Sequence, residues 1–484
     1  MCSIPRLKEV MREILPELLY AALALIVTWL TFWWWKNNRQ LPPGPWGLPL
    51  LGYVPFIKTP HLDYCRLAAQ YGDVFSFRTV GSQLFVILNS SKAIKEVLVN
   101  RADEFNNRLP KNNLLNWLSD GQGIAQEVGE VWSEHRKFFL QTAKSLGFGK
   151  MEVEGRIHDE VRRMLTDMRS ESKNQCVRLS DHVSYVANST ISHVLFNRSF
   201  KKDETFKKHV SNMDKFIATF NGYPNLLVGI PFEIFFAWFT NANQRRVELR
   251  KFSDSMVAER IRVRDSDNPE GFVDCFLNQR EDLIKKGHKD GGTFTISRLE
   301  ATAWNMYFAF ESTGCTAVGL LLELSKHSSV QQMIQSELDS VVGRERLPSW
   351  GDRSNMPYLD ACMQELYRVA SQFPLTAIYS NTKETTIKGF RIPVHSAIVA
   401  NLHSINQDPE IFPQPEKFEP NRFLDSSGKR IKVEGPYPFG LGKRTCIAES
   451  LAQMEVFIII TSVVQSFIMQ PGDNDGTVRL IPRE

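Results

Sequence analysis

Residues 439–448 read FGLGKRTCIA, and this stretch decides how the rest of the chain is interpreted. Gly440 and Gly442 lack a Cβ, so the backbone can turn tightly and approach a flat ligand closely. Cys446 precedes an apolar, helix-forming stretch, and a thiolate at the amino end of a helix is stabilised by the helix dipole and by free N–H groups. Arg444 can neutralise a carboxylate. The segment therefore predicts a thiolate beside a bound flat ligand, although a buried structural cysteine is still open at this point.

Three further motifs lie elsewhere in the chain. Glu365 and Arg368 stand three residues apart, so on a helix they share one face and can pair. Residues 418–423 read FEPNRF. Trp132 and Arg136 stand four residues apart, so on a helix both can reach one acidic group, the indole through its N–H and the guanidinium through its charge. Each motif alone is a weak signal, because charged pairs are common on solvated helix surfaces.

Together, these motifs resemble those of the cytochrome P450 family. The family patterns F-x-x-G-x-R-x-C, E-x-x-R, F-x-P-x-R-F and W-x-x-x-R all occur here in the family's order and spacing. The family usually has Gly two residues after the cysteine, where this chain has Ala448. LGFGK at 146–150 and RSNMPY at 353–358 are similar to the microsomal branch of animal enzymes, which includes drug-metabolising, steroid-hydroxylating and insect-hormone-making members. The resemblance covers almost the whole chain.

The resemblance implies a haem-thiolate fold, mainly α with a small β subdomain, and haem b (iron protoporphyrin IX) as the cofactor. Cys446 is then the metal ligand. The family's motifs imply that the cofactor-binding residues are Trp132, Arg136, Phe439, Gly442, Arg444 and Cys446. Arg422 is expected to join Glu365 and Arg368 in a buried network that holds the cysteine loop. Removing one partner from such a network leaves an uncompensated buried charge, which is costly.

The hydrophobic patterning agrees with that fold class. Residues 74–77 and 84–88 predict short strands around a turn. Between 131 and 335, apolar residues recur at the three- and four-residue spacing that is typical of helices. Residues 359–370 predict another amphipathic helix, and 383–399 predict short strands.

The segment 307–313, YFAFEST, aligns with the family's oxygen-handling helix. In this alignment Glu311 is the acid, and Ser312 stands where the family usually has Thr. Thr313 follows directly and takes the role if the register slips by one. We expect these three residues to be catalytic, because a hydroxyl here can hydrogen-bond dioxygen and relay protons.

The substrate pocket departs from the family's usual composition. Phe308 and Ala309 stand where Ala and Gly are usual, and with Leu375 and the loop 111–118 they are expected to shape the pocket. Ordinary core packing is the alternative for Phe308. The segment 472–484 is shorter than the family's last hairpin, which often touches substrate.

The expected haem propionates have fewer basic partners here than is usual for the family. Tyr379 and Ser380 replace a common His-Arg pair, and Asp120 replaces a common Arg. Tyr379 can still donate one hydrogen bond. These departures bear on the geometry of the site more than on haem binding.

Residues 18–35 read LLYAALALIVTWLTFWWW, without a charge, and span roughly 27 Å as a helix, close to the hydrocarbon thickness of a bilayer. Lys36 and Arg39 follow and favour a cytoplasmic body. The expected divisions are an N-terminal segment 1–17, a transmembrane anchor helix 18–35, a Pro/Gly-rich linker 36–60 and a catalytic domain 61–484. We expect a single-pass protein of the endoplasmic reticulum membrane. A cleaved signal peptide is the alternative, but no small-residue cleavage site follows. Residues 224–239 are also strongly apolar, as core or as a loop in the bilayer.

The resemblance implies a monooxygenase that inserts one oxygen atom from O2 into a lipophilic substrate: a steroid, sesquiterpenoid, fatty acid or xenobiotic. An axial thiolate favours O–O cleavage. No G-x-G-x-x-G fingerprint is present in a strand–helix context, so electrons must come from a partner, which the family implies to be an NADPH-dependent flavoprotein reductase. Its expected docking face is the basic surface near Arg136, Lys137, Lys144 and Lys443.

Two other functions are left open, and the altered oxygen-handling helix motivates the first of them. One is a reductase-independent haem-thiolate peroxide isomerase or dehydratase, and the other is a non-catalytic haem-binding protein. Nucleic-acid binding is not expected, because the net charge is only +4 over 484 residues and no basic run is interleaved with aromatic residues.

Overall fold

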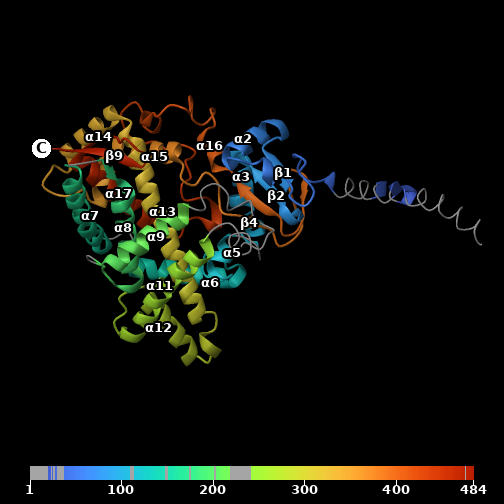
Figure 1. Cartoon of the computed structure of the whole chain (residues 1–484), viewed down its shortest axis with the longest axis horizontal. Coiled ribbons are helices and arrows are strands. Elements are labelled where there is room, and N and C mark those ends of the chain that lie inside the picture. The colour runs from blue at the N-terminus through green and yellow to red at the C-terminus, as the bar shows by residue number, and fades with distance from the viewer. Residues whose placement is uncertain are drawn as a thin grey trace, which may run out of the picture.

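The computed structural model has a mainly helical body with small sheets, which confirms the predicted fold class (Figure 1). The structure describes residues 20–22, 24–25, 28–29, 38–109, 114–147, 151–173, 176–200, 203–218, 241–474 and 476–483. The α-helices are α2 (Pro60–Tyr71), α3 (Ser91–Lys95), α4 (Ala102–Phe105), α5 (Leu114–Ser119), α6 (Gly129–Ser145), α7 (Met151–Glu171), α8 (Leu179–Phe196), α9 (Glu204–Ala218), α11 (Ala242–Val263), α12 (Phe272–Lys285), α13 (Ile296–Ser325), α14 (Ser328–Val341), α15 (Pro357–Ala370), α16 (Leu402–Asn406) and α17 (Glu449–Ser466).

The described strands form three small sheets. The largest has the order β1-β2-β7-β4, with bounds Val74–Arg78, Leu84–Leu88, Ala397–Ala400 and Tyr379–Ser380. β1 and β2 pair antiparallel around the predicted turn, and β2 pairs parallel with β7. The other sheets are β3-β9-β8 (Val177–Arg178, Thr477–Pro482, Phe467–Pro471) and β5-β6 (Thr385–Ile387, Phe390–Ile392). The predicted strands at 74–77, 84–88 and 383–399 are all present.

The four-stranded sheet is buried on both faces. In β2, Val86 and Leu88 belong to one apolar cluster, whereas Phe85 and Ile87 belong to another on the opposite face. Because successive side chains in a strand point to opposite faces, a strand covered on both sides needs a continuous apolar run. The sequence LFVIL of β2 is such a run, and all five residues are buried.

Helices α13 and α17 form the centre of the helical body. α13 runs for 30 residues, begins at Thr295, whose hydroxyl caps Arg298 N, and crosses the body from one side to the other (Figure 1). α17 is buried around almost its whole circumference, as expected for a helix that is apolar on every side. Both helices belong to one large apolar core with α8. α13 provides one wall of the cavity described below, and the start of α17 provides part of its floor.

The amino-terminal predictions fall mostly outside the described residues. Of the predicted anchor at 18–35, the described residues are helical, and Tyr20, Leu25 and Trp29 among them are exposed. No helix within the described ranges combines the length and apolarity that a membrane crossing needs. The apolar stretch 224–239 lies entirely outside the described residues.

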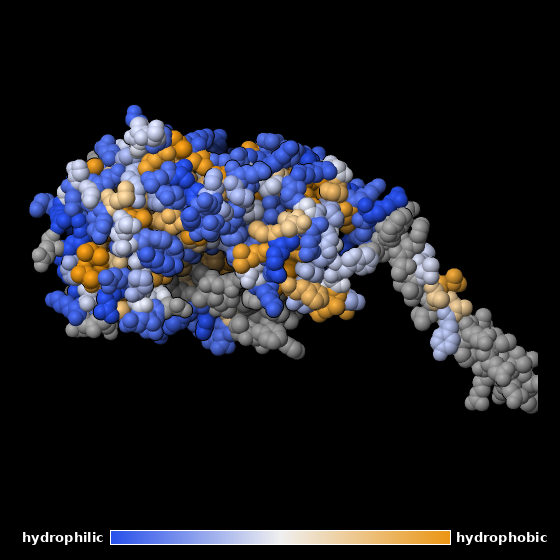
Figure 2. Space-filling model, turned by 90° about the horizontal axis from the view of Figure 1, so that it is seen from above, coloured by the Kyte–Doolittle hydropathy of each residue, from blue (hydrophilic) through white to orange (hydrophobic). Residues whose placement is uncertain are grey.

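The expected linker is packed against the first strand from Pro42 onward. Ser76 in β1 donates its backbone N–H to Pro43 O (2.8 Å) and its hydroxyl to Pro42 O (2.7 Å). Between residues 46 and 56, large apolar side chains are exposed: Trp46, Leu48, Leu50, Leu51 and Phe56. Figure 2 shows apolar surface at this end of the body, where the chain leaves toward its amino terminus.

Candidate active site

The cysteine loop is held in place by two glycines with positive φ. Gly442 has φ +73°, and a Cβ added there would lie 1.7 Å from Leu98 O, so only glycine fits. Gly440 has φ +76°, and its Cβ position points into open space. Cys446 N donates to Phe439 O at 2.9 Å, which closes the loop. These contacts fix Cys446 three residues before the first turn of α17.

The thiol of Cys446 opens onto a cavity in the middle of the body. Helix α13 contributes one wall, the segment 371–379 a second, and the cysteine loop with the start of α17 the floor. The Cys446 side chain is exposed toward this cavity while lying deep in the protein. Burial raises the pKa of the thiol, whereas the N–H of Ala448 and the charge of Arg136 act in the opposite direction. The thiol is therefore accessible from within the cavity.

Three arginines gather at one side of the cavity without a carboxylate partner among the described side chains. Arg444 donates to Asn106 O (2.8 Å) and Glu127 O (2.7 Å), Arg108 donates to Ala125 O (3.1 Å) and Ile378 O (2.9 Å), and Arg136 donates to Thr445 O (2.9 Å). Nη1 of Arg444 is buried and has no hydrogen-bond partner in the described part of the protein.

The electrostatics of these arginines favour binding of an anionic ligand beside them. Burial, with the charges of Arg108 and Arg136 nearby, lowers the pKa of Arg444. Burial also lowers the pKa of Arg108 and raises that of Tyr379, whose ring lies 5.0 Å from the Arg108 guanidinium. Buried charges in proteins are normally paired. A ligand with carboxylate groups would complete this cluster.

Arg108 was missed by the sequence analysis, which expected few basic partners on this side. It stands in the segment NNRLP, which carries no recognisable motif. Its position at the cavity depends on hydrogen bonds to residues 17 and 270 positions further along the chain. Only the tertiary structure reveals it.

Trp132 and Arg136 lie together in α6 as their spacing predicts, and the Trp132 ring contacts two of the arginines. The Arg444 guanidinium lies 3.9 Å from the ring centroid, and the Arg136 guanidinium lies 5.7 Å from it. Such cation–π contacts fix both guanidinium groups. Trp132 therefore helps to orient the two arginines, and it is not among the described residues that line the cavity.

The catalytic candidates on α13 point in different directions. Ser312 and Thr313 both line the cavity, and the Ser312 hydroxyl donates to Ala309 O. Glu311 is fully buried and accepts a hydrogen bond from Asn188 Nδ2 of α8. It faces the contact between the two helices and is not among the described residues that line the cavity. The helix continues unbroken through Ala309, where the family's usual Gly would loosen it.

Of the residues predicted to shape the substrate pocket, some line the cavity and one does not. Ala309 and Leu375 line the cavity. Phe308 is partly buried against the core, with its ring near Trp304 and Phe216, each with a centroid separation of 6.3 Å. It is not among the described cavity-lining residues, so its observed contacts are those of the alternative reading, core packing. The cavity wall also contains Thr316 and Thr376, which the sequence analysis did not select.

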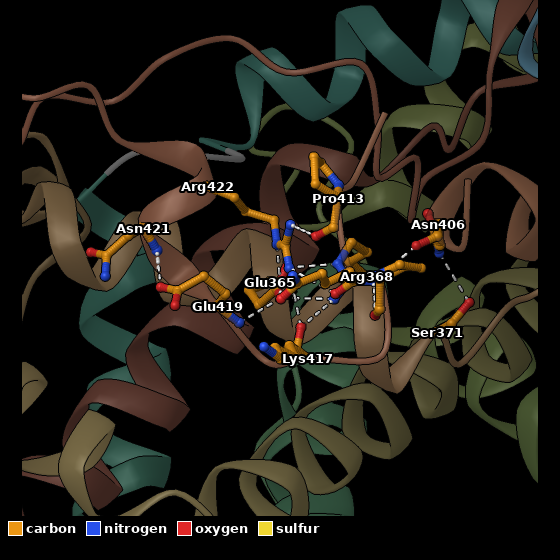
Figure 3. A network of polar contacts seen from close by, with 11 residues as sticks. Glu365, Arg368, Ser371, Asn406, Pro413, Lys417, Glu419, Asn421 and Arg422 are labelled. Atoms are coloured by element: carbon orange, nitrogen blue, oxygen red, sulfur yellow. Dashed lines mark hydrogen bonds and ion pairs between the residues drawn. The ribbon is translucent and has the colours of Figure 1, made fainter. Parts of the chain in front are cut away.

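Glu365, Arg368 and Arg422 form a buried network (Figure 3). The Glu365 carboxylate accepts two hydrogen bonds from Arg368 (both 2.7 Å) and one from Arg422 (3.2 Å), and the Glu365 and Arg368 side chains are 0% exposed. Arg368 also donates to the carbonyls of Asn406, Pro415 and Lys417. We expected these three residues to form a buried network that holds the cysteine loop.

The network is connected to the cysteine loop through α15. Its hydrogen bonds pin the segment 406–422 to α15 and do not reach residues 439–446. The contact with the cysteine loop is made by the next residue of α15, Tyr367, whose ring lies edge-on to Phe439 at 6.1 Å. The network therefore stabilises the support behind the loop.

Comparison with known proteins gives one consistent result. A profile of the family described as Cytochrome P450 matches residues 42–480. Cytochrome P450 2C70 of Rattus norvegicus is 33% identical over 459 residues, which cover 93% of each chain. Cytochrome P450 2C5 of Oryctolagus cuniculus is 32% identical, with 92% of each chain covered. Cytochrome P450 2F5 of Gorilla gorilla gorilla is 31% identical over 92% of this chain and 91% of its own.

Proposed function

Because the chain belongs to the cytochrome P450 family, in its microsomal animal branch, and is therefore a haem-thiolate monooxygenase, we propose that it oxidises a lipophilic steroid, sesquiterpenoid, fatty acid or xenobiotic at the endoplasmic reticulum membrane. The observation that carries the proposal is the Cys446 thiol, which opens into a cavity walled by α13. Peroxide isomerisation and non-catalytic haem binding are not favoured, since the family match spans nearly the whole chain.

The residues present fit haem b, iron protoporphyrin IX. Cys446 would be the iron ligand, Gly440 leaves open space for a flat ring, and Gly442 and Phe439 hold the loop. Arg444, with its free buried Nη1, would bind a propionate. Arg108, Arg136 and Tyr379 would complete the side of the site that binds the anionic propionates. When bound, a thiolate-ligated haem supplies activation of dioxygen.

The protein's own residues then position the substrate and move protons. Among the described lining residues, the distal wall is made of apolar side chains and hydroxyl groups: Ala309, Ser312, Thr313, Thr316, Leu375 and Thr376. Such a wall suits a lipophilic molecule with few polar groups. Thr313 is 7% exposed, and within the described structure its hydroxyl donates to no neighbour, so it can hold a proton at Oγ1. The Ser312 hydroxyl must first leave Ala309 O.

The proposed electron donor is an NADPH-dependent flavoprotein reductase. Lys137 and Lys144 of α6 are exposed, and Lys443 of the cysteine loop is exposed beside Asp103, with which it pairs. Arg136 is committed to Thr445 O and does not belong to this surface. An acidic partner docked here would lie on the cysteine side of the site.

Membrane attachment is proposed through the anchor helix 18–35, after an N-terminal segment 1–17, with a linker 36–60 and a cytoplasmic catalytic domain 61–484. The exposed apolar residues between 46 and 56 support attachment at that end of the body. The proposal is tested by incubating the haem-loaded protein with a microsomal reductase, NADPH and a panel of lipophilic compounds. Product formation that requires reductase and O2 supports it, whereas conversion of a lipid hydroperoxide without reductase would overturn it.

A further inference from the structure

Gln372 follows the end of helix α15, and its side chain packs directly on the backbone of α13. A Cβ added at Gly319 of α13 would lie 2.0 Å from Gln372 Nε2 and 2.9 Å from Gln372 Cδ. Gln372 is exposed and lines the cavity. Glycine is unfavourable inside a helix, but at position 319 it makes room for the amide group against α13.

The backbone on both sides of Gln372 is anchored to neighbouring elements. The Ser371 hydroxyl accepts a hydrogen bond from Asn406 Nδ2 of α16 at 3.3 Å (Figure 3). Further along, Thr376 N donates to Ala400 O of β7 (3.0 Å), and Thr376 Oγ1 accepts from Ala400 N (3.1 Å). Because the segment is bonded at both ends, the position from which the Gln372 side chain starts is fixed.

The Gln372 amide is free to bind a ligand. Within the described part of the chain it makes no hydrogen bond, so two N–H donors and one carbonyl acceptor are available in the cavity. The hydroxyls of the neighbouring wall are committed: Ser312 donates to Ala309 O, and Thr316 donates to Ser312 O at 2.8 Å. A polar ligand group therefore finds its donors at Gln372 rather than at these two hydroxyls.

Two other lining residues have polar atoms without a partner in the described structure, but these atoms are enclosed. They are the Tyr367 hydroxyl and Asn406 Oδ1, and both atoms are buried. The two residues are only 7% and 4% exposed. Neither atom presents surface to a ligand as Gln372 does.

The amide lies on the same face of α13 as the residues expected to handle oxygen. Gly319 stands seven residues after Ser312, close to two helical turns, so the two positions share one face about 10 Å apart. Thr316, between them, also lines the cavity. A polar group bound at Gln372 is therefore about two turns of α13 away from the Ser312 position.

We propose that Gln372 is a specificity-determining residue that binds the polar group of an otherwise lipophilic substrate, and that Gly319 positions its amide. A carbonyl oxygen accepts from the amide N–H, and a hydroxyl can also donate to Oε1. The substrate class is then lipophilic ketones and alcohols whose polar group lies about 10 Å from the oxidised carbon. A site with an unpaired polar group discriminates against an analogue that leaves it unpaired. The inference rests on the proposed monooxygenase function and names its substrate class.

The test uses the haem-loaded full-length protein and two rigid probes: androstanone, a saturated steroid ketone with its carbonyl on a terminal ring, and androstane, the same skeleton without the carbonyl. Binding is followed by the absorbance change of the ferric haem. Gln372→Met keeps the length of the side chain but removes its hydrogen-bonding groups. The ratio of the two affinities should shift against the ketone by about fivefold to tenfold in this variant, the size that one net hydrogen bond supplies. The affinity for androstane should stay the same.

Gly319→Ala tests the position of the amide without altering its chemistry. The added Cβ would meet only the far end of the flexible Gln372 side chain, so the amide moves while α13 gains a residue with better helix propensity. The ketone preference should fall as in Gln372→Met, with haem retained. Two matched controls should leave the preference unchanged: Gly155→Ala in α7, where nothing lies within 4 Å of the Cβ position, and Gln332→Met on the exposed surface of α14.

Turnover with a microsomal reductase and NADPH gives a second readout, which a merely structural role would not change. The unaltered protein should oxidise androstanone at the end of the skeleton away from its carbonyl. Gln372→Met should oxidise both ends, as identified by mass spectrometry of the products.

The outcomes separate this inference from the function on which it rests. An unchanged ketone preference in Gln372→Met, or an equal fall in Gln332→Met, would overturn the role of Gln372. Loss of haem from Gln372→Met with the preference unchanged would place the amide against the cofactor and overturn that role as well. Absence of any reductase-dependent product from the unaltered protein with the whole panel of lipophilic compounds would instead refute the monooxygenase function.

Discussion

Replacing Gly442 by Ala tests whether the cysteine loop is fixed by close backbone contact. A Cβ at this position would lie 1.7 Å from Leu98 O, whereas real Cβ contacts are essentially never below 3.0 Å, so the two backbones must separate by about 1.3 Å. Holding an alanine at φ +73° costs about 1–2 kcal/mol. Overpacking of this kind adds about 1–3 kcal/mol, for a total loss of about 2–5 kcal/mol in the free energy of unfolding.

Gly428→Ala is the matched control. Gly428 has φ +78° and nothing within 4 Å of its Cβ position, so it should lose only the conformational part, about 1–2 kcal/mol. Unfolding is measured by urea titration, and haem retention by absorbance after gel filtration. We expect Gly442→Ala to lose haem as well as stability, because Cys446 moves with the loop. Equal stability and equal haem content in the two variants would refute the reasoning.

Four further outcomes follow from the structure. Cys446→Ala should abolish the thiolate-type spectrum of the reduced carbon monoxide complex, and a retained spectrum would exclude Cys446 as the ligand. Thr313→Ala should lower product formed per NADPH consumed more than Ser312→Ala, because the Ser312 hydroxyl is bonded to its own helix; the reverse order would assign the proton relay to Ser312. Glu365→Ala should cost about 3–5 kcal/mol, measured by urea unfolding, since it strands buried arginine charge; a loss below 1 kcal/mol would contradict a buried network. Burial raises the pKa of Glu455 to about 7, so the protonated side chain contributes fully to stability below pH ~4.5, and this contribution is lost as the pH rises through 7. The free energy of unfolding of Glu455→Gln should therefore exceed that of the unaltered protein by up to about 3 kcal/mol at pH 8 but not at pH 4.5. A difference that does not depend on pH would contradict this.

The fold and the floor of the site could be predicted from sequence because their determinants are local. The cysteine loop brings Gly442, Arg444 and Cys446 together within five positions, and the Glu365–Arg368 pair depends only on helical spacing. The strand at 84–88 is predicted by its own apolar run. Residues that are only a few positions apart have few possible relative arrangements in a folded backbone, so such patterns predict their geometry directly.

Sequence could not decide how side chains meet across distant segments. Arg108 joins the cavity through a carbonyl 270 positions away, and Asp120 meets Arg246 126 positions away. Nor could it decide which helix face a residue occupies: Glu311 points to Asn188 of α8, whereas its neighbour Ser312 points to the cavity. On a helix, successive residues are turned by about 100°, so a neighbour in sequence can face the core or the substrate.

The sequence by itself determined the family, the thiolate loop and the buried glutamate–arginine pair, since each depends on residue types at short fixed spacing. The tertiary structure alone decided which arginines gather at one side of the cavity, that Phe308 packs against Trp304, and that Asp120 pairs with arginines of α11. Those contacts depend on how whole helices pack, and packing sums many weak interactions that no short stretch of sequence contains.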